Sequence, residues 1–80
     1  MRRVGRSGFP AKNPDSESLQ RGLAISWLKL GDLEDRFGEK EKAEDYWRQA
    51  LAIFEARLAI NPLSVQLRED VEHTRRRLGE

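Results

Sequence analysis

The chain contains no cysteine and only one histidine among its 80 residues. Disulfide bonds and thiolate metal sites are therefore excluded, and His73 has no second imidazole or thiolate with which to hold a zinc ion. No apolar run approaches the roughly 20 residues that a membrane-spanning helix needs. No apolar signal-peptide core follows the basic start. We therefore expect a cytoplasmic protein without metal, cofactor or membrane association.

Sequence features that carry catalysis are missing as well. No glycine-rich loop leads from a strand into a helix, as phosphate-binding sites require. The five serines have no base at a suggestive spacing. The acidic residues between positions 32 and 45 alternate with lysine and arginine, as on a solvated helix face, whereas acid–base catalysis needs carboxylates confined in an apolar cleft. We expect no enzymatic activity.

Charge is nearly balanced overall, but it is uneven along the chain. Lysine and arginine number 15 against 14 acids, for a net charge of +1, and residues 1–14 hold four bases and no acid. Glycine and proline also occur there, and the apolar residues show no period. This predicts a disordered basic tail at 1–14 ahead of a helical domain at 15–80. A flexible start is the favoured interpretation of this tail, and electrostatic contact with nucleic acid is the alternative.

Nucleic-acid binding could also use Arg75, Arg76 and Arg77 together with the aromatic residues. The aromatic side chains, however, fall on helical stripes, where core packing is favoured over base stacking. We therefore do not expect nucleic acid to be a partner.

The apolar residues recur at steps of three and four, which predicts helices throughout the domain. The first stripe consists of Leu19, Leu23, Trp27, Leu30, Leu33 and Phe37. We expect helices near 16–37, 39–60 and 63–78. Gly38 ends the first helix and Asn61-Pro62 ends the second. The predicted fold is all-α, an antiparallel helical hairpin followed by a third helix.

Large and small residues around the hairpin follow a fixed order. Trp27, Leu30 and Gly31 stand in the first helix, Gly38 in the turn, and Ala43, Trp47 and Ala50 in the second helix. This order resembles the tetratricopeptide repeat, a helical hairpin that stacks into superhelical arrays. The resemblance implies a non-catalytic protein–protein interaction module. Small residues let two helices approach where they cross, so we expect Gly31 and Ala50 near the crossing.

An internal repeat supports this interpretation. A shift of 48 residues aligns six identical pairs without a gap, namely Asn13/Asn61, Pro14/Pro62, Ser16/Ser64, Leu19/Leu67, Leu30/Leu78 and Gly31/Gly79. The third helix is therefore the first helix of a second repeat. The family period is 34 residues. Each helix here gains about two turns, which leaves the buried side unchanged. Arg75 replaces Trp27 in the second copy, which suits a solvated cap.

The resemblance also implies a ligand groove lined by the first helix of each repeat. The corresponding positions here are Ile25, Leu28, Asp32, Asp35 and Arg36, to which the second copy adds His73, Arg76 and Glu80. Family members that hold the C-terminal carboxylate of chaperones use lysine and asparagine where this chain has Leu28 and Asp32. That specificity is not expected, and an extended peptide or a partner helix is the implied ligand.

A structural, self-assembling unit is the alternative function. The second helix is apolar over a wide arc, formed by Leu51, Ile53, Phe54, Leu58 and Ile60. These side chains cannot all face one neighbour, and repeat arrays need about three repeats for stability. We therefore expect self-association, most simply as a two-fold homodimer, with helix exchange as one route.

Overall fold

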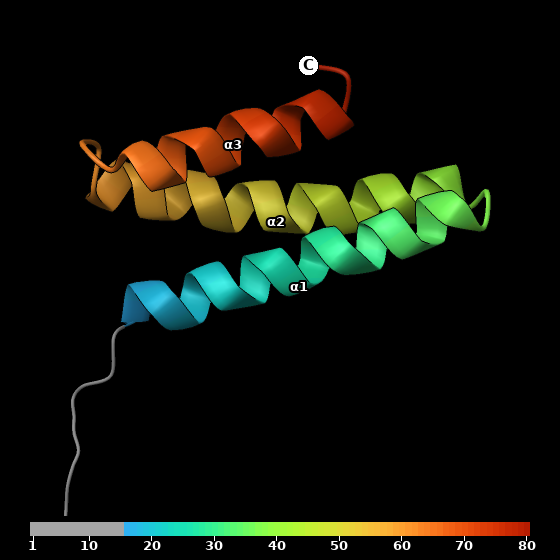
Figure 1. Ribbon diagram of the computed structural model, residues 1–80, viewed down its shortest axis with the longest axis horizontal. Coiled ribbons are helices and arrows are strands. Elements are labelled where there is room, and N and C mark those ends of the chain that lie inside the picture. The colour runs from blue at the N-terminus through green and yellow to red at the C-terminus, as the bar shows by residue number, and fades with distance from the viewer. Residues whose placement is uncertain (1–15) are drawn as a thin grey trace, which may run out of the picture.

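The computed structural model describes residues 16–80, which form three α-helices (Figure 1). They are α1 (Ser16–Arg36), α2 (Lys40–Ile60) and α3 (Val65–Arg77). No strand occurs between residues 16 and 80, so the predicted all-α fold is confirmed, and each helix end lies within two residues of its expected position. The predicted disordered tail at 1–14 lies outside the described residues.

The middle helix organises the fold. Figure 1 shows α2 between α1 and α3 and running antiparallel to both. The main helix–helix contacts are correspondingly α1 with α2 and α2 with α3. The predicted antiparallel hairpin with a third helix is therefore confirmed. The second turn leads into α3 through Ser64, whose hydroxyl accepts a hydrogen bond from the amide of Leu67 at 3.1 Å and so caps the helix.

Gly38 ends α1 as the sequence predicts. Its φ angle is +79°, a left-handed conformation that costs a residue with a side chain more than it costs glycine. The amide of Glu39 donates to the carbonyl of Glu34 at 2.9 Å, and the amide of Gly38 donates to the carbonyl of Asp35 at 3.0 Å. These two bonds satisfy carbonyls at the end of α1, and the chain reverses to begin α2 one residue after Glu39.

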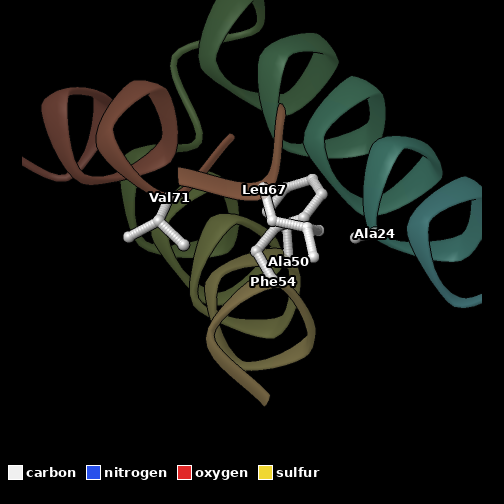
Figure 2. Close-up of a cluster of buried hydrophobic side chains, with 5 residues drawn as sticks. All are labelled: Ala24, Ala50, Phe54, Leu67 and Val71. Carbon is white, nitrogen blue, oxygen red and sulfur yellow. The ribbon is translucent and has the colours of Figure 1, made fainter. Parts of the chain in front are cut away.

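The core is centred on Phe54 of α2, which is fully buried (Figure 2). Ala24 of α1 and Leu67 and Val71 of α3 belong to the same buried cluster, together with Ala50. One aromatic side chain therefore fills the space where all three helices meet. Thr74, also fully buried, donates its hydroxyl hydrogen to the carbonyl of Asp70 at 2.7 Å, which satisfies the only polar side chain buried among residues 17–80.

A second close contact lies nearer the first turn, at Gly31. A Cβ atom at this position would overlap the indole ring of Trp47 and would lie 3.0 Å from the carbonyl oxygen of Ala43. Glycine therefore lets α1 approach α2 here. Gly31 and Ala50 are both expected near the crossing of the two helices, and the structure buries both. Gly31 lies against Trp47 of α2, and Ala50 shares the core cluster with Ala24, seven residues before Gly31 on the same side of α1.

The wide apolar arc of α2 does not leave the exposed surface that the sequence suggested. Phe54 is buried, and Leu51, Ile53 and Leu58 are partly buried against the core cluster. Ile60 alone among the five is largely exposed. The expectation of excess apolar surface on the second helix is therefore wrong, because α2 has two neighbours and α3 covers the side that α1 leaves free.

Candidate functional site

Most of the leucines of α1 are exposed and not packed in the core. We call the following five residues the α1 stripe: Leu19 (66% exposed), Leu23 (47%), Leu30 (41%), Leu33 (45%) and Phe37 (72%), the last lying just beyond the helix end. Trp27 belongs to the same periodic pattern but is half-buried, and its ring stacks on that of Tyr46 with the centroids 5.6 Å apart. These residues lie on one face of a helix, as their periodicity predicts, but most of this face meets no helix of residues 16–80.

The orientation of α1 follows from its small residues. Ala24 and Gly31 are seven residues apart, two turns along one side of the helix, and both are buried. Because α1 meets α2 through these two positions, the leucines fall on the far side. Close backbone packing at Ala24 and Gly31 therefore leaves the leucines of the α1 stripe exposed.

The second copy of the internal repeat shows how this helix face is covered when another helix comes before it in the chain. Leu67, Val71 and Thr74 of α3 are the repeat equivalents of Leu19, Leu23 and Ser26. The three residues in α3 are at most 5% exposed, because α3 packs against α2. Their equivalents in α1 are all exposed. The same repeat positions are therefore covered by a helix in one copy and uncovered in the other.

The uncovered surface is large for so small a chain. Taking about 200 Å² for a fully exposed large apolar residue, the α1 stripe presents on the order of 500 Å². The largest apolar patch of a monomeric protein is roughly 300–600 Å², and patches of this kind are often functional. The α1 stripe is therefore the strongest candidate for a contact surface among residues 16–80.

The groove positions predicted on α1 have varied surroundings. Ile25 and Leu28 are half-buried and pack against the core cluster. One carboxylate oxygen of Asp35 lies 3.6 Å from the ammonium group of Lys40. Arg36 is exposed at the end of the helix. These residues therefore do not form a single open surface, although each remains a predicted partner contact.

Asp32, another predicted groove residue, joins all three helices. The Arg77 guanidinium of α3 donates two hydrogen bonds to its carboxylate, at 2.8 Å and 3.0 Å. The indole nitrogen of Trp47 in α2 donates a third at 3.1 Å. The hydrogen bonds from Arg77 lower the pKa of Asp32 below its ordinary value, and their effect is larger than the opposing effect of burial. The positive charge of Arg77 and the hydrogen bond from Trp47 lower the pKa further. The carboxylate is thus engaged within the fold.

The groove residues predicted on α3 lie on its open surface. His73 and Arg76 line a shallow hollow together with Gln66, Glu69, Asp70 and Glu72. Glu80 shares a neighbouring hollow with Arg76. The structure therefore brings His73 and Arg76 together, while the predicted residues of α1 lie mainly against the core or in ion pairs.

Two ion pairs that sequence reasoning missed connect α1 directly to α3. Arg21 donates to Asp70 at 2.7 Å, and Arg77 pairs with Asp32 as described above. The partners are 49 and 45 residues apart in sequence, close to the repeat length of 48. Opposite charges about one repeat apart in the sequence are the signal that could have predicted these ion pairs. In a stacked array, the first helices of successive repeats are neighbours, and their equivalent positions lie close together.

Comparison with known proteins identifies no relative of this chain. No family model, curated protein or solved structure matches it. Within residues 16–80, no three side chains of the metal-binding types come together as a candidate ion site. Of the described helices, none combines the length and the apolar character that crossing a membrane requires.

Proposed function

We propose that the chain is a non-catalytic protein-binding module of tetratricopeptide-repeat type, and that its α1 stripe receives an amphipathic helix of a partner. The supporting observation is the contrast between equivalent positions of the two repeat copies. Leu67 is 1% exposed beneath α2, whereas Leu19 is 66% exposed with no helix of residues 16–80 over it.

The repeat type is supported by how the small residues are used. Gly31 lets α1 approach the ring of Trp47, and Ala43 and Ala50 are fully buried on α2. The third helix then takes the place on α2 that a following repeat would take (Figure 1). Gly31, Ala43 and Ala50 are among the residues that carry the resemblance to the family.

A helix suits the α1 stripe better than an extended peptide. An extended peptide that adds a strand needs unpaired backbone groups at a sheet edge, and α1 uses its backbone groups within the helix. The stripe runs from Leu19 to Phe37, five turns of helix, and a partner helix can follow it along that length. The competing interpretation is an extended peptide in the predicted groove near Leu28 and Asp32.

The flanks of the stripe add a requirement on charge. Lys29 is exposed on one side of Leu30, and Glu34 lies beside Leu33 on the other. A partner helix with complementary charges beside its apolar residues would therefore be preferred. Self-association would cover the same surface without a second protein, and it is the homotypic form of this proposal. The cytoplasmic location remains a prediction from the sequence.

A peptide with the sequence of residues 39–61 is a suitable probe, because α2 covers the equivalent positions of α3. We expect saturable amide and methyl chemical-shift changes at Leu19, Leu23 and Leu30 when it is added to the labelled chain. We do not expect the peptide to replace α2 within the chain, because α2 is covalently linked to α1 and α3 and so has a high effective concentration beside them. The Leu30→Glu variant should lose the response, and Leu63→Glu, altered in the exposed second turn, should keep it.

The same titration separates the alternatives. Saturable chemical-shift changes centred on Leu28 and Asp32, with Leu19 and Leu23 unaffected, would show that the peptide binds in the predicted groove and not on the α1 stripe. The absence of any saturable change would contradict the proposal.

A further inference from the structure

We infer that the helix bound by the α1 stripe is α1 of a second copy, in a two-fold pair whose α1 helices run parallel. This inference rests on the proposed function and names its partner. Isologous pairing requires one surface that complements itself, and a symmetric apolar seam meets that requirement.

No other helix face between residues 16 and 80 offers a comparable surface. The remaining large apolar residues that are strongly exposed are Ile60, Leu63 and Val65, and all three lie at the connection between α2 and α3. They span about one turn, against five turns for the α1 stripe. A contact between two copies that covers most exposed apolar surface must therefore join stripe to stripe.

The spacing of the stripe is that of a two-stranded coiled coil. Positions 19, 23, 26, 30, 33 and 37 follow one another at alternating steps of four and three, so that every second position lies seven residues further along. This is the period at which a straight seam stays turned toward a partner helix. Ser26 is the one polar residue in the series. Its hydroxyl donates to the carbonyl of Gly22 at 3.1 Å within the same helix, so burial would leave no unpaired donor.

Charges beside the seam favour the parallel arrangement. In a parallel pair, the residue just before Leu30 in the sequence lies near the residue that is five places further along the other helix. Lys29 would then meet Glu34 of the second copy, and symmetry provides this pair twice. In an antiparallel pair centred on this part of the seam, Lys29 would face Lys29 of the second copy, and the two like charges would repel each other.

Space beside the seam is compatible with the same register. Gly22 would lie opposite Trp27 of the second copy. A Cβ atom at Gly22 would meet nothing within 4 Å in the single chain. Glycine here leaves room for the edge of an indole ring, whereas a large side chain at position 22 would compete for that space.

The size of the seam sets the expected strength. About 500 Å² from each copy gives a contact near 1,000 Å², below the roughly 1,600 Å² of a standard stable interface. Interfaces of this size belong to weak or transient complexes. We therefore expect a dissociation constant on the order of 10 µM rather than nanomolar.

Sedimentation equilibrium of the full chain from about 1 µM to 1 mM tests the pairing. The native chain should change from the mass of one 9.3 kDa chain to twice that mass. Leu30→Glu should weaken dimerisation at least about tenfold, because it places a charge in the seam. Leu63→Glu, altered at a residue that is 84% exposed and outside the stripe, should dimerise like the native chain.

A charge exchange tests the partner and its direction without disturbing the apolar seam. Glu34→Lys alone should weaken the dimer by about three- to tenfold, because it removes two attractive pairs. Adding Lys29→Glu should restore the affinity. Far-ultraviolet circular dichroism of each variant will show that α1 still forms.

A disulfide gives an independent measure of direction, since the native chain has no cysteine. In the parallel register, the two copies of Ser26 face each other across the seam, close enough for a bond between Ser26→Cys chains under mild oxidation. The control, Leu63→Cys, should cross-link only slowly. In an antiparallel pair, the two Ser26→Cys sites would be offset along the helices and should not cross-link efficiently.

The possible outcomes are distinct. A dimer that responds to Leu30→Glu and cross-links through Ser26→Cys supports the inference. A dimer unaffected by Leu30→Glu, or one without the Ser26→Cys cross-link, overturns it. A chain that stays monomeric at 1 mM also overturns it, while stripe-dependent binding of the 39–61 peptide would leave the proposed function intact. Loss of both dimerisation and peptide binding would remove the proposed function as well.

Discussion

Gly31 of α1 lies directly against the indole ring of Trp47 in α2, with no room for a side chain between them. Trp47 is itself buried, and its ring nitrogen donates to Asp32, one residue after Gly31. The ring is therefore held on two sides. It cannot move away from a new side chain without losing either its packing or its hydrogen bond.

The first prediction follows from this contact. Gly31→Leu should lower the free energy of unfolding by about 1–3 kcal/mol, because the added side chain overlaps a rigid ring. Urea unfolding followed by tryptophan fluorescence provides the measurement. Gly22→Ala is the matched control, since Gly22 lies in open space on the same helix and alanine there should stabilise the chain by up to about 1 kcal/mol. Equal stability of the native chain and Gly31→Leu would show that α1 and α2 are not packed this closely.

The second prediction concerns Phe54, where the three helices meet. Phe54→Ala should lower the free energy of unfolding by about 3–5 kcal/mol, because it leaves a cavity that Ala24 and Ala50 cannot fill. In a domain this small, such a loss should abolish cooperative melting at room temperature.

A milder substitution keeps the Phe54 prediction measurable. Phe54→Leu should cost about 1–2 kcal/mol and retain a two-state transition. Leu63→Ala, altered in the exposed turn, should stay within about 0.5 kcal/mol of the native chain. If Phe54→Ala unfolds cooperatively with the stability of the native chain, Phe54 does not lie at the centre of the core.

The third prediction concerns the pH dependence introduced by Asp32. Its pKa in the folded chain lies below the ordinary value of 3.8, mainly because of the hydrogen bonds from Arg77. The charged carboxylate therefore stabilises the fold at pH values above 3.8, and this contribution is lost as the pH falls through the lower folded pKa. Because the side chain is 43% exposed, we expect only about 0.5–1 kcal/mol at pH 7.

Asp32→Asn isolates this contribution. Its free energy of unfolding should be below that of the native chain at pH 7, and the difference should shrink as the pH is lowered below 3.8. Asp35→Asn is the control, because Asp35 makes only a longer, exposed pair with Lys40. A difference between the native chain and Asp32→Asn that stays constant from pH 7 to pH 2.5 would contradict the assigned ion pair.

Local sequence signals were sufficient to predict the helices and their turns. Gly38 and Asn61-Pro62 interrupt the apolar period, and the structure ends its helices there. The 48-residue repeat likewise predicted a third helix after the hairpin, and α3 packs against α2. These features depend on neighbours close in sequence or on direct identity, so they are visible without a structure.

The direction in which α1 faces could not be predicted from the same signals. Periodicity identifies a stripe such as Leu19 and Leu23, but it does not show whether a helix lies over it. Ala24 and Gly31 determine the packed side of α1, and small residues contribute little to an apolar pattern. The pairing of Asp32 with Arg77 was missed for a related reason, because it depends on how two first helices stack.

The central claim is that the α1 stripe is a surface for a helix, and appending one tests it most directly. Residues 39–60 would be placed ahead of Asn13, so that residues 13–16 join the added helix to α1 as their repeat equivalents 61–64 join α2 to α3. We expect the free energy of unfolding to rise by about 2 kcal/mol or more, because the added helix would bury Leu19 and Leu23.

Amide hydrogen exchange across α1 and the added helix is the decisive measurement on that chain. We expect the added helix to exchange slowly and the amides of α1 near Leu19 to become as protected as those near Leu67 of α3. The same addition with Leu23→Glu should lose most of this protection. An added helix that exchanges as an unfolded chain, with α1 no better protected than before, would contradict the claim.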